Sequence, residues 1–275
     1  MHVTSHSHFQ RDVRGTATMT FPVYVNLFGL HLHPHALFEL LAYTCGFQLY
    51  LFLRRRWSRA AVPLETNLWL IVGCVFGALV GAKLLAWLES PLHYWGNRAN
   101  LSILLGGKTI VGGLLGGWVG VEVAKRRLGV THSTGDVYVF PLILGMCLGR
   151  VGCFLTGLGD HTYGVHTALP WAIDFGDGPR HPTQLYEIAF LLVLAARIAL
   201  RMRHPYENGT LFRLFMLGYL AFRFTVEFIK PVYDPYFGLS MIQLACLAGM
   251  TYCVVTLTKR AAQLPRPVPQ MTEAT

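Results

Sequence analysis

Two long apolar stretches of this chain each contain an arginine: LGMCLGRVGCFLTG at 144–157 and LGYLAFRFTVEFIKP at 217–231. A charge in the middle of a membrane span costs several kcal/mol, so it persists where it faces a polar cavity, pairs with another group or binds an anion. Glu227 follows Arg223 by four residues, which places both on one face of a helix. The sequence therefore predicts a charged interior site around Arg150 and Arg223. The simpler alternative is a buried Arg223–Glu227 ion pair that only fixes helix packing.

Apolar residues dominate the composition. Of 275 residues, 53% are hydrophobic and only 13% are charged, which is too apolar for an ordinary soluble domain. The apolar runs are close to the roughly 20 residues that cross the hydrocarbon core of a bilayer. We therefore expect an all-α integral membrane protein with seven transmembrane helices, at roughly 36–53, 67–88, 103–124, 137–158, 184–202, 211–229 and 239–258.

The net charge of +9 is concentrated at alternate ends of these predicted spans. The basic clusters are Arg54, Arg55, Arg56 and Arg59; Lys125, Arg126 and Arg127; Arg201 and Arg203; and Lys259 and Arg260. Seven crossings place all four clusters on one side of the membrane, so the positive-inside rule predicts an outer N-terminus and a cytoplasmic C-terminus. This distribution favours a membrane, and not nucleic acid, as the partner of the basic residues.

The chain divides into three predicted segments. Residues 1–35 form an outer N-terminal arm, 36–258 a single membrane domain, and 259–275 a Pro-rich cytoplasmic tail that we expect to be disordered. The first 20 residues are polar and histidine-rich, so we expect no cleavable secretory signal.

No metal or organic cofactor is expected. The six cysteines all lie in apolar segments without a CxxC pair, so we interpret them as small hydrophobic residues and not as zinc ligands or disulfides. The alternating histidines of HLHPH at 31–35 lie in an arm that we expect to be extended or interfacial. Cys153 is a special case, because it lies one helical turn after Arg150.

The third predicted span begins with GGKTIVGGLLGGWVG at 106–120, whose glycines recur at small-xxx-small spacing. Such spacing lets helices approach closely, or lets a lipid chain lie against bare backbone. Lys108 is predicted about one turn from the outer end, where it either extends to the interface or faces the polar site. Glu39, at the start of the first span, is expected to be neutral, paired, at the interface or part of that site.

The outer segment after the fourth span contains GLGDHTYG at 157–164 and DFGDGPRHPTQLYE at 174–187. Asp160, His161 and His181 are its potential acid–base groups, near the ends of the spans that carry the arginines. A histidine in a loop is more often a surface residue, which is our interpretation of His161 and His166; His181 precedes a proline at a predicted helix entrance and is the better candidate.

Together these motifs resemble a known family. GRVGCF at 149–154, HPTQLYE at 181–187 and FRFTVEF at 222–228, preceded by VGGLLGG at 111–117, are similar to motifs of the prolipoprotein diacylglyceryl transferases of the bacterial inner membrane. The resemblance covers about residues 36–258. It implies a seven-helix enzyme that moves the diacylglyceryl group of phosphatidylglycerol, a membrane lipid, onto the lipobox cysteine of a prolipoprotein signal peptide and releases glycerol 1-phosphate.

The resemblance also implies roles for individual residues. Arg150 and Arg223 would hold the phosphate, because guanidinium groups bind phosphate through paired hydrogen bonds. Glu227 would orient Arg223, and Tyr219 would contact the glycerol or phosphate. The other residues expected at the site are Gln184, Tyr186 and Glu187 at its outer rim, Asp160 and His181 with the catalytic groups, and Gly164, Glu39, Lys108 and Cys153 near the substrates.

The chain departs from the family pattern at several polar positions. Val111 stands where the family usually has a histidine, and Cys153 and Thr156 replace two asparagines. The segment LGDH follows Gly157 where a glutamate is expected, and Glu39 aligns with a tyrosine. The thiol base would then be one of Asp160, His161, His181 or Glu39. Alternatively no base is needed, because an electropositive cavity lowers the thiol pKa below its usual value of about 8.5.

Three functions stay open at the level of sequence. The first is the diacylglyceryl transferase, of the standard reaction or with a related acceptor. The second is a non-catalytic membrane protein of the same fold that binds anionic phospholipid. A transporter is the third, although the chain shows none of the inverted repeats common in transporters.

Overall fold

A computed structural model describes residues 9–11, 17–19, 21–27, 30–57, 62–231 and 236–263, and these residues are mostly helical. The long helices are α1 (Pro34–Arg56), α2 (Leu64–Glu89), α5 (Ile110–Leu128), α6 (Val139–Thr156), α7 (Thr183–Arg201), α8 (Thr210–Val226) and α9 (Met241–Gln263). The shorter ones are α3 (Pro91–Gly96), α4 (Leu101–Leu105), and the 3-10 turns η2 (Asp136–Tyr138), η3 (Gly157–Asp160) and η4 (Glu227–Ile229).

The described residues also form three small antiparallel hairpins. They are β1 (Phe9–Arg11) with β2 (Ala17–Met19), β3 (Val25–Leu27) with β4 (Leu30–Leu32), and β5 (Ile173–Asp174) with β6 (Pro179–Arg180). The first two precede α1 within the predicted N-terminal arm, and the third lies in the segment between α6 and α7.

Within the part of the chain that the structure describes, five stretches are long and apolar enough to cross a membrane: α1, α2, residues 136–160 around α6, α7 and most of α9. The other two predicted spans correspond to α5 and α8. Helix α8 has only 17 residues, and α5 ends in a basic turn of Lys125, Arg126 and Arg127, so neither provides an equally long apolar run. The structure therefore shows a mostly helical, multi-pass membrane architecture.

Two predicted boundaries differ from the structure. The third span was expected from residue 103, but α5 begins at Ile110, because Gly106 and Gly107 interrupt the helical pattern and the Thr109 side chain accepts the Gly112 N–H at 3.2 Å as a cap. At the other end, α9 continues to Gln263, into the segment predicted as tail. Residues 264–275 lie outside the described residues.

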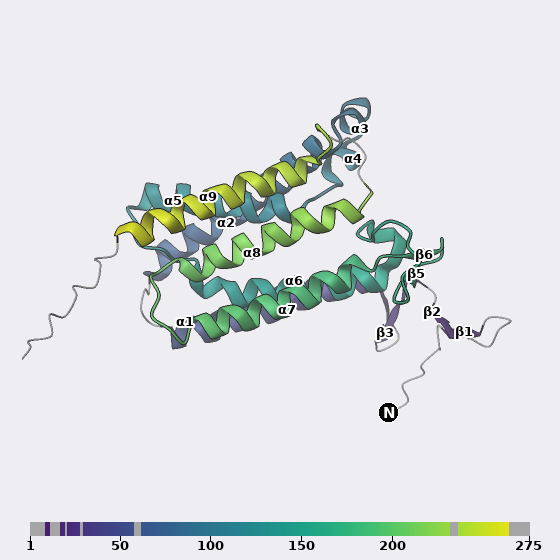
Figure 1. The fold of residues 1–275 in the computed structure, drawn as a ribbon, viewed down its shortest axis with the longest axis horizontal. Coiled ribbons are helices and arrows are strands. Elements are labelled where there is room, and N and C mark those ends of the chain that lie inside the picture. The colour runs from purple at the N-terminus through teal and green to yellow at the C-terminus, as the bar shows by residue number, and fades with distance from the viewer. Residues whose placement is uncertain are drawn as a thin grey trace, which may run out of the picture.

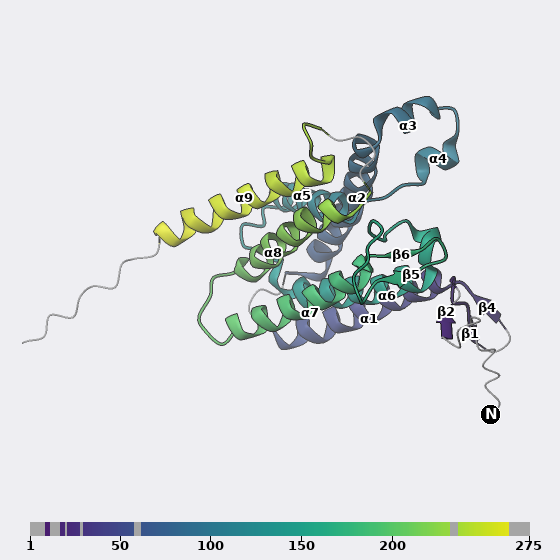
Figure 2. The ribbon, with the colours of Figure 1, turned by 45° about the vertical axis from the view of Figure 1, so that its right-hand side comes forward.

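The helices form two groups with α8 between them. Figures 1 and 2 show α2, α5 and α9 on one side of α8, and α1, α6 and α7 on the other. The most extensive packing is between α2 and α5, then between α1 and α6 and between α8 and α9. The main core includes Val111, Ile143, Leu191, Phe215 and Cys246.

A polar side chain from a distant segment fixes the start of α8. The Asp136 carboxylate accepts the backbone N–H groups of Gly209 at 2.6 Å and Phe212 at 2.9 Å. Helix α9 begins with a reciprocal cap, in which Ser240 N donates to Gln243 Oε1 at 2.9 Å and Gln243 N donates to Ser240 Oγ at 3.1 Å. These caps satisfy N–H groups that lack partners at helix starts.

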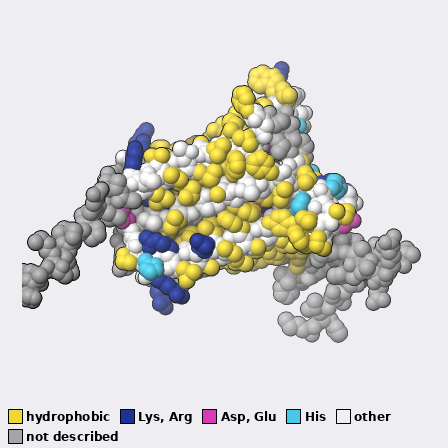
Figure 3. Space-filling view, in the orientation of Figure 1, with side chains coloured by type: hydrophobic (Ala, Val, Ile, Leu, Met, Phe, Trp, Pro, Cys, Tyr) yellow, Lys and Arg dark blue, Asp and Glu magenta, His cyan; other side chains and the backbone are white. Residues whose placement is uncertain are grey.

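The surface is consistent with a lipid-facing bundle. Many large apolar side chains of α2 are exposed, including Trp69 at 57% and Phe76 at 69%. In Figure 3 hydrophobic side chains cover the visible middle of the bundle, while Lys and Arg gather toward the end where α9 terminates. The opposite end carries α3, α4 and the β5–β6 hairpin.

Candidate active site

The charged site forms where three helix ends meet. Arg150 lies near the end of α6, Arg223 in the last turn of α8, and Glu187 at the start of α7. Arg223 lies in the last turn of its helix, where the partial negative charge of a helix C-terminus favours a cation. All three side chains are buried, with exposures of 5%, 6% and 2%.

Glu187 connects the two arginines. Its Oε2 atom lies 2.9 Å from Arg150 Nε and 3.8 Å from Arg223 Nη1, and its Oε1 atom accepts a 2.8 Å hydrogen bond from Tyr219. Arg223 Nη2 donates to Glu227 Oε2 at 2.8 Å. Two guanidinium groups are therefore held side by side by two carboxylates.

Arg223 retains unused hydrogen-bonding capacity. Its Nε and Nη1 atoms are buried and have no hydrogen-bond partner among the residues that the structure describes. Buried donors without a partner are rare, because each forfeits a hydrogen bond to water. The cluster is therefore suited to an anion that accepts hydrogen bonds from Arg223.

A second chain of polar contacts runs outward from this cluster. Gln184 Nε2 donates to Thr162 Oγ1 at 3.1 Å, and Thr162 Oγ1 donates to Asp160 Oδ2 at 2.7 Å. Asp160 Oδ1 lies 2.9 Å from Nδ1 of His35. Cys153 lies next to both the arginine cluster and this second chain of contacts. Its Sγ accepts from Arg150 Nη1 at 3.8 Å and is close to His35 and Asp160.

The structure buries some residues that were predicted at the outer rim. Gln184 and Glu187 are 1% and 2% exposed, because the first turn of α7 packs against α6 and α8. Tyr219, expected to contact the glycerol or phosphate, donates its hydroxyl to Glu187. Tyr186 is the rim residue of this set: its hydroxyl accepts from Trp171 Nε1 at 2.8 Å and lies 3.2 Å from His181 Nδ1.

His181 contacts Tyr186, and among the described residues it makes no hydrogen bond or ion pair with the arginine cluster. Gly164 serves the backbone of the outer segment: its N–H donates to the His181 carbonyl at 2.9 Å, and a Cβ at Gly164 would lie 2.7 Å from His181 Cβ. Glu39 and Lys108 form a separate, more exposed pair with Oε1 3.4 Å from Nζ.

Sequence reasoning missed three residues of the site. Thr162 had no motif to mark it, and His35 was assigned to the extended arm, although it lies in the first turn of α1. Lys230 follows η4, beyond the end of α8. Burial, together with the guanidinium groups of Arg223 and Arg150, lowers the pKa of Lys230 to about 7. Proximity in sequence to Glu227 was the only signal for it.

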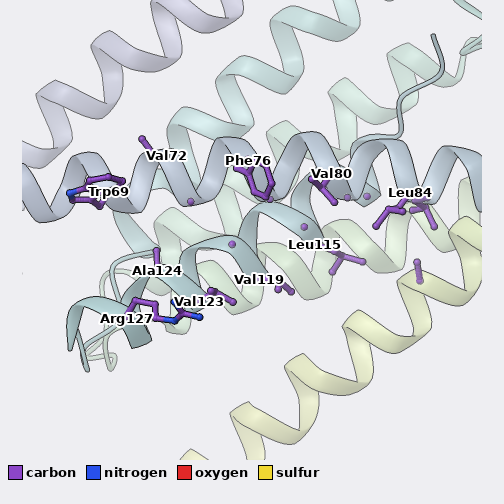
Figure 4. Close-up of a pocket in the computed structure, with 18 of the residues that line it drawn as sticks. Trp69, Val72, Phe76, Val80, Leu84, Leu115, Val119, Val123, Ala124 and Arg127 are labelled. Atoms are coloured by element: carbon purple, nitrogen blue, oxygen red, sulfur yellow. The ribbon is translucent and has the colours of Figure 1, made fainter. Parts of the chain in front are cut away.

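A separate apolar groove lies along α2 and α5. Figure 4 shows Trp69, Phe76 and Val80 from α2 lining it, with Val119 of α5 on the other side. It has a volume of about 740 Å³, and Arg127 is its only charged lining residue. None of the residues of the buried charged cluster lines this groove.

The comparison with known proteins identifies the family of this constellation. The family model described as prolipoprotein diacylglyceryl transferase matches residues 22–259. The chain belongs to the prolipoprotein diacylglyceryl transferase family. It is therefore an enzyme of a transferase family, and the resemblance seen in its motifs is confirmed.

Several relatives carry the name phosphatidylglycerol–prolipoprotein diacylglyceryl transferase. The protein of Methylococcus capsulatus (strain Bath) is 32% identical over 261 residues, covering 88% of this chain and 96% of the relative. That of Nitratidesulfovibrio vulgaris (strain Hildenborough) is 37% identical, covering 70% and 74%. That of Bordetella avium (strain 197N) is 32% identical, covering 79% and 84%.

Proposed function

We propose that this chain transfers the diacylglyceryl group of phosphatidylglycerol to the lipobox cysteine thiol of prolipoproteins and releases glycerol 1-phosphate. The observation that carries the proposal is the buried arginine pair, in which Arg223 keeps two N–H groups without a hydrogen-bond partner among the described residues. The relatives are named for this reaction, and their similarity extends over the membrane domain.

The arginine pair suits the bond that must break. The acceptor sulfur attacks a glycerol carbon, the carbon–oxygen bond to phosphate breaks, and the electron pair leaves on the phosphate oxygen. Guanidinium groups that are already oriented in a dry site stabilise that developing charge without reorganisation. Glu187 and Glu227 hold Arg150 and Arg223 in position, so the cations are preorganised for the phosphate.

For the membrane topology we propose seven spanning helices over about 36–258, with the N-terminus outside and the C-terminus in the cytoplasm of a bacterial inner membrane. The basic last turns of α1 and α5, which contain Arg54–Arg56 and Lys125–Arg127, support this orientation. The charged site then lies toward the outer leaflet, since α6 and α8 end there and α7 begins there.

In this orientation the two substrates arrive by different routes. The lipid enters laterally through the apolar flank of the bundle, and the acceptor peptide approaches from the outer side. Val111, at the position where the family usually has a histidine, is 1% exposed within the apolar core and offers no proton acceptor. That observation favours a second candidate, a non-catalytic protein that binds anionic phospholipid.

An assay of the purified full chain in detergent separates these functions. The substrates are phosphatidylglycerol and a lipobox peptide, and the products followed are glycerol phosphate and the mass of the peptide. We expect a diacylglyceryl mass gain that depends on both the peptide cysteine and phosphatidylglycerol. A cysteine-to-alanine peptide and phosphatidylethanolamine are the matched controls.

Other outcomes of this assay would support a different function. Glycerol phosphate released without peptide modification would indicate another acceptor. Tight binding of phosphatidylglycerol with neither product would overturn the transferase in favour of the lipid-binding protein. Phosphatidylglycerol taken up into vesicles unchanged would favour the transporter.

A further inference from the structure

Three side chains of different chemistry meet at the outer edge of the charged site. His35 from α1, Cys153 from α6 and Asp160 from η3 bring one side-chain atom each within 4.8 Å of one another. The closest contact is 2.9 Å, between His35 Nδ1 and Asp160 Oδ1. Neither the family motifs nor the spacing of the sequence singled out His35.

This cluster is continuous with the arginine site. Cys153 Sγ lies 3.8 Å from Arg150 Nη1, and Asp160 is joined through Thr162 to Gln184 in the first turn of α7. One side chain therefore separates the imidazole of His35 from the guanidinium of Arg150. Cys153 thus contacts Arg150 on one side and lies within 4.8 Å of the imidazole of His35 on the other.

Solvent exposure differs between His35 and the arginine site. The His35 side chain is 30% exposed, whereas that of Arg150 is 6% exposed. An acceptor that approaches the arginines from the exposed side meets the imidazole first. His35 therefore lies on the more exposed side of Arg150, the side from which the acceptor peptide is proposed to approach.

We propose that His35 is the base that takes the proton of the acceptor thiol, and that Asp160 is its positioning residue. This inference rests on the proposed transferase function. A carboxylate beside Nδ1 favours the tautomer with the proton on Nδ1, which leaves the lone pair on Nε2 free to accept a proton. Among the described residues, the charged group that faces Nε2 is the Glu39 carboxylate, whose Oε2 lies 3.8 Å away.

The proposed step needs only the acceptor thiol, the lipid, His35 and the two arginines. The thiol proton moves to His35 Nε2 while the sulfur electron pair forms the new bond to the glycerol carbon. The carbon–oxygen bond to the phosphate breaks, and its electron pair stays on the phosphate oxygen held by Arg150 and Arg223. The imidazolium then gives its proton to the departing phosphate or to water, which restores neutral His35.

Asp160→Asn tests the positioning role, because it keeps the shape of the side chain and removes the carboxylate 2.9 Å from His35 Nδ1. The kcat of this variant should fall while its KM for phosphatidylglycerol stays unchanged, a split that a purely structural role for Asp160 would not produce.

Two competing interpretations are testable in the same preparation. A histidine, a cysteine and an aspartate are also zinc ligands, although a guanidinium 3.8 Å from the sulfur opposes a bound cation. Lys230, whose pKa is lowered by burial to about 7, is the other base near the arginines. Lys230 follows η4 and is not part of the cluster of His35, Cys153 and Asp160 that adjoins Arg150, which is why the geometry favours His35.

The test uses the full chain in detergent with phosphatidylglycerol and a lipobox peptide. His35→Gln is compared with the wild type, with Lys230→Gln and with His93→Gln, a control at an exposed histidine of α3. Loss of a positioned base typically lowers the rate by about 100-fold or more, so we expect that loss in His35→Gln at neutral pH. We expect the deficit to shrink above about pH 8.5, where the thiol ionises by itself.

A second variant tests the role of His35 separately from any effect on folding. In His35→Ala, added imidazole should restore part of the lost turnover, whereas it should have no effect on His93→Gln or the wild type. Thermal melting of each variant in detergent shows whether it is folded.

Three results would overturn the inference. The first is a His35→Gln enzyme within about twofold of wild type at neutral pH, especially if Lys230→Gln loses turnover. The second is a deficit that stays constant across pH. The third is one zinc per wild-type chain that is lost in His35→Gln, together with loss of activity on chelation. If the wild type is inactive with both substrates, the proposed function is wrong, and the inference that rests on it is wrong as well.

Discussion

Helices α2 and α5 bury backbone against backbone, whereas α6, α7 and α8 bury charge against charge. A Cβ added to Gly77 would overlap the Gly116 carbonyl, and one added to Gly116 would overlap that of Gly77. Among the described residues, neither helix has a buried polar side chain that lacks a hydrogen-bond partner. The charged site is different: Arg223 is held at two carboxylates and still has donors to spare. Unfilled hydrogen-bonding capacity, and not burial, distinguishes a binding site from a packing contact.

The largest effect should come from the arginines. Arg150→Ala and Arg223→Ala should each lower turnover by about 1,000-fold or more, because each removes a donor aimed at the phosphate. Product formation by the purified variants is the measurement. Arg98→Ala is the control, since Arg98 is exposed and packs over Trp95 in the α3–α4 segment. Undiminished turnover of either variant would rule out the phosphate-binding role.

Substitution of the packed glycines should lower the stability of the protein and leave its chemistry unchanged. Gly77→Ala and Gly116→Ala should each destabilise the bundle by about 3 kcal/mol or more, because the backbone carbonyl opposite cannot move aside. Gly96→Ala is the matched control, since its Cβ would meet nothing within 4 Å. Thermal midpoints in detergent measure the loss. Any folded fraction should keep its turnover, and a stable but inactive Gly116→Ala would contradict the separation of the two regions.

A smaller effect should follow from a change within the charged site. Glu227→Gln keeps the shape of the side chain but removes the charge that holds Arg223 at 2.8 Å. Hydrogen bonds to charged groups contribute about 1.5–3 kcal/mol, so turnover should fall by roughly 10- to 100-fold. Steady-state rates measure this. Glu122→Gln removes an equivalent charge from a pair with Lys125 on α5 and should leave turnover unchanged.

The smallest effect should come from the outer hairpin. Arg180 donates to the Asp177 carboxylate and holds the pKa of Asp177 below its usual value. The contribution of this pair is therefore present above the ordinary aspartate pKa and is lost as the pH falls through the lowered one. Because Asp177 is exposed, Asp177→Asn should leave the thermal midpoint at neutral pH unchanged within error. A marked drop would show that the hairpin supports the site.

The predictions from sequence succeeded where one segment carries the signal. The apolar runs around Arg150 and Arg223 identified helices α6 and α8, because hydropathy and helical spacing are local properties. The start of the third span was wrong by about two turns, because Gly106 and Gly107 separate the short helix α4 from α5, which begins at Ile110. Glu187 was expected at the rim, because one helix alone does not show which neighbours cover its first turn.

The sequence by itself determined that this chain is a helical membrane protein of its family and that two arginines lie inside its bundle, since the cost of burying charge can be seen in a single apolar run. Only the tertiary structure decided which groups those arginines meet. Glu187 lies between them, and His35 lies beside Asp160, although 125 positions separate these last two in the chain. Contacts across such distances depend on how α1, α6 and α7 pack, and no local pattern encodes that packing.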